Sequence, residues 1–172
     1  MDILKLQNYA IRLKTLKRKG WLLKGIQNCE SVADHSYGTV LFSFSLASKL
    51  KLNIEKCISL ASIHDLAESI VSDITPHDGI SESKKLEDEM FAFQKISEES
   101  GFPRLLELAY EYTKNKTEEA MLVHDADKLE MVMQAIIYQK ETGKDMSEFI
   151  EYTKNKLHNP ESKKIFEELI SS

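Results

Sequence analysis

A histidine directly followed by an aspartate, His64-Asp65, interrupts an otherwise apolar run of this sequence, and Glu68 follows one helical turn later. Residues three and four positions apart share a face of a helix, so Glu68 is expected to lie over both His64 and Asp65. Burying three groups that bind metals or transfer protons costs free energy, which a chain without a use for them would avoid. The stretch therefore predicts a metal site or an acid–base site near one helix end.

Further residues have the chemistry to complete a metal site with the His64-Asp65 pair. His35 lies in the first turns of an expected helix, and a later helix carries both Asp125 and Asp127. Two imidazoles and two carboxylates form a nitrogen–oxygen ligand set that suits Mn²⁺, Co²⁺, Fe²⁺, Ni²⁺ or Zn²⁺ better than Ca²⁺. Because Asp125 and Asp127 are two residues apart, they point to nearly opposite sides of their helix, and periodicity alone does not choose between them.

Acid–base and anion-binding groups accompany this ligand set. Glu68 and Asp73 are carboxylates able to orient an attacking water or to take its proton, although Asp73 alone is also explained as an ordinary loop residue. A basic cluster that includes Arg18 precedes Trp21. An arginine forks onto a phosphate, and an indole packs against a sugar or a base. The lysines of the cluster are better explained as a solvated helix end: Lys14, Lys17 and Lys19.

Composition limits the classes of partner. The 172 residues suffice for one domain with a sizeable core, and we expect a single domain over residues 1–172. The net charge of −5, without a basic stripe, argues against nucleic acid as a partner. The sequence has no apolar run that could span a bilayer and no signal-peptide pattern at its start. Cys29 and Cys57 lack metal-type spacing, so we expect reduced thiols in a cytoplasmic protein.

Apolar residues recur at helical spacing along most of the chain, and no stretch alternates convincingly with period two. An all-α fold of seven or eight helices is therefore predicted. The expected helices cover residues 2–16, 32–50, 54–70, 82–100, 103–115, 117–142, 146–157 and 160–170. The helix over 54–70 is apolar nearly all round, which is typical of a central helix. Residues 20–30 and 71–81 are expected to be loops.

Four segments, in this order, resemble the HD-domain metal-dependent phosphohydrolases, and among these the 5′-deoxynucleotidase branch. The segments are Glu30–Ser36, His64–Glu68, Asp73–Ile80 and Asp127–Met131. The similarity runs from about residue 13 to about residue 149, which is most of the chain. A His-Asp pair alone is a weak signal, whereas these four segments in order are a strong one.

The resemblance implies an all-α fold, a divalent metal ion such as Co²⁺ or Mn²⁺, and a homodimer. It also implies hydrolysis of a deoxynucleoside 5′-monophosphate to deoxynucleoside and phosphate. The family's last motif has its aspartate three residues before a Glu-Met pair, which selects Asp127 over Asp125. Carried over position by position, the metal ligands are His35, His64, Asp65 and Asp127.

The same resemblance assigns the remaining site residues. Glu68 would orient or activate the attacking water, with support from Asp73, and Trp21 would flank the substrate. In bacterial members an arginine directly precedes that tryptophan, but here Gly20 takes its place and Arg18 is the nearest arginine. Arg18 or a nearby lysine is therefore expected to steady the phosphate. The loop expected to line the nucleoside pocket consists of Asp73, Ile74, Thr75 and Pro76.

Three other functions compete with this one. An HD hydrolase could act on another phosphoester, such as a guanosine polyphosphate or a nucleoside triphosphate. A non-catalytic regulator could keep the same ligands to bind a nucleotide or a metal. A purely structural helical scaffold would bind no metal at all.

Overall fold

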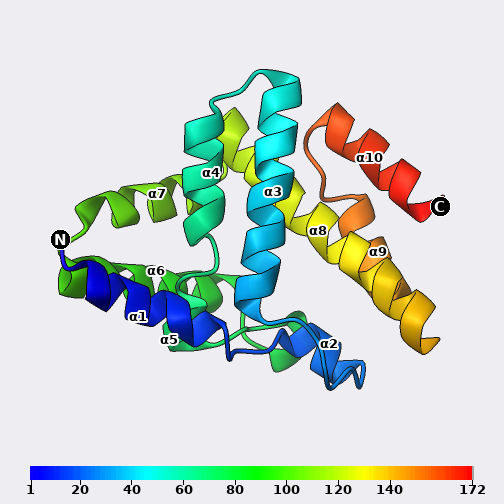
Figure 1. The fold of residues 1–172 in the computed structure, drawn as a ribbon, viewed down its shortest axis with the longest axis horizontal. Coiled ribbons are helices and arrows are strands. Elements are labelled where there is room, and N and C mark those ends of the chain that lie inside the picture. The colour runs from blue at the N-terminus through cyan, green and yellow to red at the C-terminus, as the bar shows by residue number, and fades with distance from the viewer. Residues whose placement is uncertain (172) are drawn as a thin grey trace. The chain divides into compact units, whose positions relative to one another are not determined.

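The computed structural model describes residues 1–171, which fold into helices joined by turns and loops (Figure 1). Ten α-helices and one 3-10 helix occur in this range, more than the seven or eight expected. Their bounds are α1 Ile3–Leu13, α2 Lys19–Leu23, α3 Val32–Leu50, α4 Ile54–Ile63, α5 Glu68–Val71, η1 Pro76–Asp78, α6 Glu82–Ser100, α7 Pro103–Lys114, α8 Glu118–Thr142, α9 Ser147–Lys154 and α10 Pro160–Ile170. No described residue belongs to a strand, and the all-α prediction is confirmed.

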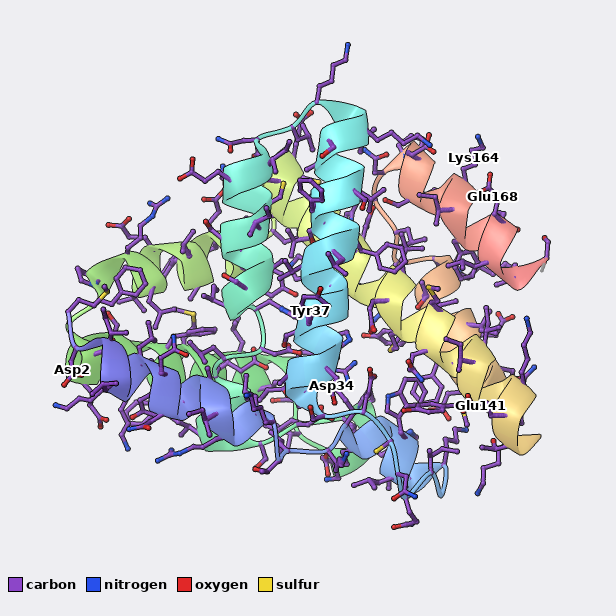
Figure 2. The ribbon with its side chains drawn as sticks, in the orientation of Figure 1. Asp2, Asp34, Tyr37, Glu141, Lys164 and Glu168 are labelled. Carbon is purple, nitrogen blue, oxygen red and sulfur yellow. The ribbon has the colours of Figure 1, made fainter. Side chains whose placement is uncertain are left out.

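Local capping residues set the ends of the long helices. Thr117 caps α8 and Ser81 caps α6, and each side chain accepts a hydrogen bond from a backbone N–H in the first turn. Gly143 (φ 70°) and Gly101 (φ 62°) end the same two helices in the left-handed conformation, which glycine adopts without a Cβ clash. Asp2 caps α1 in the same way as Thr117 and Ser81 (Figure 2). These boundaries lie within two residues of those expected from the sequence.

The expected single helix over residues 54–70 is wrong. α4 ends early, and a tightened turn over residues 64–67 leads into the short α5. Hydrogen bonds between residues three apart run through this turn, among them Glu68 N to Asp65 O at 3.0 Å. His64 and Asp65 therefore lie in a turn between two helices and not in the middle of one.

The hydrophobic periodicity also failed to predict two short helices, α2 and η1. α2 occupies the start of the expected loop over residues 20–30, and η1 lies inside the expected loop over 71–81. A helix of three to five residues contains too few apolar positions to show a period. Such helices form because of contacts with distant residues: the first N–H of α2, on Lys19, donates to Asp73 Oδ2 at 2.6 Å.

The described chain forms two compact units, of which the first comprises residues 1–36 and 62–114. Within it, α1 packs on α5 and α6, and α6 also packs on α5 and α7 (Figure 1). Apolar side chains from three of these helices form its core: Tyr9, Leu13, Phe93, Ile96, Leu105 and Leu108. This unit contains every predicted site residue except Asp127.

The second unit comprises residues 37–61 and 115–171. Within it, α8 packs against α9 and α10 (Figure 1). Buried apolar side chains hold this unit together: Leu46, Leu60, Val123, Leu129, Met146 and Phe166. The single domain expected over residues 1–172 stays a prediction, and residue 172 lies outside the described residues. None of the described helices is long and apolar enough to cross a membrane.

Candidate metal and phosphate site

His35 enters the site from the first turns of α3 and is fully buried. Ser31 and Asp34 fix where this helix starts (Figure 2 labels Asp34). The Asp34 carboxylate accepts hydrogen bonds from Ser31 N (2.8 Å) and Ser31 Oγ (2.7 Å), while Asp34 N donates to Ser31 Oγ (3.2 Å). This reciprocal capping satisfies backbone donors at the helix start. His35 N donates to Ser31 O at 3.2 Å, so the imidazole is held about one turn into the helix.

His64 and Asp65 bring a second imidazole and a carboxylate to His35. Asp65 Oδ2 lies 3.2 Å from His64 Nε2 and 3.7 Å from His35 Nε2. The two imidazole rings meet edge to face, with their centroids 5.5 Å apart. The structure thus brings three of the predicted ligands together in the first unit.

This donor set fits a divalent cation. Asp65 Oδ2 is buried and accepts no hydrogen bond of good geometry from the described residues, although both Nε2 atoms lie close to it. A buried carboxylate with a purely structural role is normally hydrogen-bonded through its oxygens. Two ring nitrogens and a carboxylate oxygen that share one small space are instead typical ligands of Mn²⁺, Co²⁺, Zn²⁺ or a similar ion.

Arg18 adds a cation beside the same carboxylate. Its Nη1 lies 3.6 Å from Asp65 Oδ2, and its side chain is 14% exposed. Burial raises the pKa of Asp65, but the two imidazoles and the guanidinium outweigh this and hold that pKa well below its usual range. Asp65 is therefore ionised at physiological pH, as a metal ligand must be.

Glu68 places a second acid next to this cluster, with unusual proton affinity. It is 6% exposed, and its Oε2 accepts no hydrogen bond from the part of the chain that the structure describes. Burial raises the pKa of Glu68 well above its usual value, and the negative charges of Asp65 and Asp73 raise it further. A carboxylate with a raised pKa is a stronger base than an ordinary one.

The loop that follows α5 is held by hydrogen bonds at both ends. Asp73 Oδ2 accepts the Lys19 N–H, which fixes the start of the loop to α2. Asp78 Oδ2 accepts hydrogen bonds from Thr75 N (2.8 Å) and Thr75 Oγ1 (3.0 Å), which close a capping box around η1. Of the predicted substrate residues in this loop, Pro76 is exposed and three are half-buried: Asp73, Ile74 and Thr75. Their contact with a nucleoside stays a prediction.

Trp21 is packed into the first unit, and two lysines of the basic cluster bind nearby groups from the surface. The indole of Trp21 is 1% exposed, and its Nε1 donates to Glu30 Oε1 at 2.8 Å. Lys17 Nζ donates to a backbone carbonyl at 2.6 Å, and Lys19 Nζ forms an ion pair with Asp78. Lys17 is exposed and the Lys19 side chain is 42% exposed, so both remain in contact with solvent while their ammonium groups also tie loops together. The role of Trp21 beside a substrate stays a prediction.

Sequence reasoning missed two charged residues of α6. Lys85 Nζ donates to Ile74 O at 3.0 Å and lies 3.6 Å from Glu89 Oε1. In the sequence, the pair Lys85 and Glu89 resembles the adjacent pair Lys84 and Asp88, because each joins a lysine to an acid four residues later on the same helix. No local signal could have separated the two pairs, since only packing decides which one meets the loop.

Asp125 and Asp127 lie on α8, in the second unit. Asp125 is fully buried, and its Oδ1 accepts the His158 N–H (2.8 Å) and lies 2.9 Å from His158 Nδ1. Its Oδ2 accepts the Asn159 N–H at 2.8 Å. Both oxygens of Asp125 therefore serve the connection between α9 and α10. Asp127 is half-buried on the same helix, and its assignment as the fourth ligand stays a prediction.

The fold and this cluster define a class: an all-α protein whose adjacent His-Asp pair meets a second buried histidine. Residues 10–169 match the family model of the HD domain, and the chain belongs to this family. Membership implies that the protein binds a divalent metal ion.

Relatives and solved structures agree with this assignment. The chain is 38% identical over 165 residues to the 5′-deoxynucleotidase HDDC2 of Dictyostelium discoideum, covering 87% of this chain and 86% of that protein. It is 39% identical over 147 residues to the 5′-deoxynucleotidase hdd1 of Schizosaccharomyces pombe, covering 80% and 74%. A conserved hypothetical protein from Pyrococcus furiosus has a similar structure, with a TM-score of 0.86 at 36% identity over 98% of this chain and 99% of that one. The structure of a protein from Pyrococcus horikoshii has a TM-score of 0.80 at 36% identity, over 98% of this chain and 96% of that one.

Proposed function

We propose that this chain is a divalent-metal-dependent phosphohydrolase that converts deoxynucleoside 5′-monophosphates to deoxynucleosides and phosphate. The observation that carries this assignment is the convergence of two imidazoles and the Asp65 carboxylate, with the buried acid Glu68 one turn further along the chain. The relatives from D. discoideum and S. pombe, which are named 5′-deoxynucleotidases, support the choice of substrate.

Four side chains would hold the metal, which we propose to be Co²⁺, Mn²⁺ or a similar ion: His35, His64, Asp65 and Asp127. Asp127 is favoured over Asp125 because both Asp125 oxygens already accept hydrogen bonds from the chain. When bound, such an ion polarises the phosphoryl group and offsets the negative charge that builds there during hydrolysis.

Glu68 is the proposed base. Its carboxylate would orient the attacking water and accept its proton as the new bond to phosphorus forms. The bond from phosphorus to the 5′ oxygen would break in the same reaction, and that oxygen would take up a proton to become the hydroxyl of the deoxynucleoside. The neighbouring charges of Asp65 and Asp73 favour this transfer, because they make a proton on Glu68 more stable. Asp73 would therefore assist the reaction through its charge as well as through the loop it anchors.

Arg18 is the proposed phosphate clamp. Its guanidinium lies at the Asp65 carboxylate, with donors that can fork onto two phosphoryl oxygens. The loop over residues 73–76 would receive the nucleoside, since Asp73 is hydrogen-bonded to the residue that follows Arg18. Trp21, three residues beyond Arg18, would border the same pocket.

We also propose that the enzyme is a cytoplasmic homodimer that binds a small nucleotide and not nucleic acid. The net charge of −5 disfavours a polyanionic partner. The two free cysteines, Cys29 and Cys57, are buried thiols that suit a reducing compartment. The family resemblance implies the dimer, which light scattering of the purified protein would test.

Metal analysis coupled to a phosphate-release assay tests this function. The purified protein would be stripped with a chelator, reloaded with Co²⁺, Mn²⁺ or Mg²⁺, and given deoxyribonucleoside and ribonucleoside monophosphates. We expect phosphate release from the deoxy compounds, lost on chelation and restored by metal. Release only from triphosphates or guanosine polyphosphates would overturn the substrate class. Metal binding without release from any nucleotide would favour a regulator.

A further inference from the structure

One cation reaches the site from α6, a helix that carries none of the predicted site residues. Lys85 Nζ donates to Ile74 O at 3.0 Å, so it holds the backbone of the loop that begins at Asp73. On its other side Nζ lies 3.6 Å from Glu89 Oε1, one turn further along α6. The Lys85 side chain is 39% exposed, so its ammonium is partly withdrawn from water. It therefore bridges α6 and the loop.

The charges around this ammonium belong to the proposed catalytic centre. Burial lowers the pKa of Lys85, but four carboxylates outweigh this and raise that pKa above its usual value: those of Glu89, Glu68, Asp65 and Asp73. In turn, the positive charge of Lys85 opposes the causes that raise the pKa of Glu68. Lys85 and Glu68 therefore interact electrostatically.

The adjacent lysine shows that this placement is specific. Lys84 is 55% exposed and pairs with Glu87 (3.3 Å) and Asp88 (2.8 Å) on its own helix. Such exposed pairs contribute little to stability. Lys84 therefore provides a matched control, with the same side chain one residue away.

We propose that Lys85 is a positioning residue for the hydrolysis, holding the loop over residues 73–76 against α6, with Glu89 keeping its side chain extended toward the loop. This role rests on the proposed function, since the loop takes its role from it. Lys85 acts through the loop.

Steady-state kinetics of Lys85→Met, Lys85→Arg and Lys84→Met test this role in the metal-loaded protein. We expect Lys85→Met to lower kcat about 10- to 100-fold, as loss of a supporting residue commonly does, with bound metal unchanged and KM within about threefold. Lys85→Arg keeps a charged donor and should recover most of the activity. Lys84→Met should match the unaltered protein. A Lys85→Met kcat equal to that of Lys84→Met, or an arginine variant as slow as the methionine variant, would overturn the proposal.

Hydrogen exchange separates this inference from the proposed function. In Lys85→Met the Thr75 amide should exchange faster than in Lys84→Met, because the loop has lost its tie to α6. Unchanged exchange would refute the tie even if activity fell. If the unaltered protein hydrolysed no nucleotide, faster exchange would support the tie while the proposed function failed. Should Lys85→Met not fold, Glu89→Gln provides the second test, with a smaller loss of kcat expected and an unchanged kcat counting against the proposal.

Discussion

Buried carboxylate oxygens in the two units of this protein have opposite hydrogen-bonding environments. Asp125, in the second unit, receives backbone N–H groups of His158 and Asn159 on its two oxygens. Asp65 and Glu68, in the first unit, each bury an oxygen that accepts no well-formed hydrogen bond from the described residues. A buried carboxylate that is hydrogen-bonded by its own chain stabilises the fold. A buried carboxylate oxygen without a hydrogen bond from its own chain indicates a binding or catalytic site, where the fold gives up some stability for function.

The largest expected effect tests the acid that faces the imidazoles. Asp65→Ala removes the carboxylate shared by His35 and His64, so we expect metal binding to be lost and phosphate release to fall at least about 1,000-fold. Metal analysis and the phosphate assay measure both. Asp125→Asn is the control, and it should keep its metal. Full activity in the Asp65 variant would remove this carboxylate from the site.

Next in size is the loss of the base. Glu68→Ala or Glu68→Gln should lower kcat about 10²- to 10⁴-fold, the range usual for a general base, while the metal stays bound. Turnover and metal content are measured on the same sample. Exposed Glu87, changed to Gln, should have no effect on either quantity. If turnover in the Glu68 variants were unchanged, Glu68 would have no part in the mechanism.

The hydrogen-bonded acid should show the opposite pattern. Asp125→Ala leaves the His158 and Asn159 N–H groups without their acceptor, so the free energy of unfolding should fall by about 2 to 3 kcal/mol. Denaturant unfolding measures this loss, and metal content per folded molecule should not change. A variant that is fully stable but binds no metal would reverse the roles assigned to the two acids.

The smallest expected effect concerns pH and the metal-free protein. Because the folded pKa of Glu68 is raised above its ordinary value of 4.5, the folded state holds this proton more tightly than the unfolded state. The stability from that proton is present below pH 4.5 and is lost as pH rises through the folded pKa. Glu68→Gln should therefore unfold at a higher denaturant concentration than the unaltered protein near neutral pH, with the difference vanishing at low pH. A difference that stays constant with pH would contradict the raised pKa.

Much of the fold could be predicted because its signals are local. Thr117 and Gly143 mark the ends of α8 by their own side-chain and backbone chemistry, and periodicity locates the helix between them. The break after α4 could not be predicted in this way. Leu66 and Ala67 continue the apolar pattern beyond the His64-Asp65 pair, so the pattern favours an unbroken helix, whereas the folded chain leaves the α-helix at residues 64–67.

The same distinction between local and long-range signals applies to the site. The sequence by itself determined which chemistry was at hand, since His35, the His64-Asp65 pair and Glu68 are recognisable from residue type and spacing. Only the tertiary structure decided that Lys85 contacts the loop after α5, and that Asp125 accepts hydrogen bonds from residues more than 30 positions away. The physical reason is that a helical period describes one helix at a time. The partner of a buried charge, by contrast, is chosen by packing between segments that are distant in the chain.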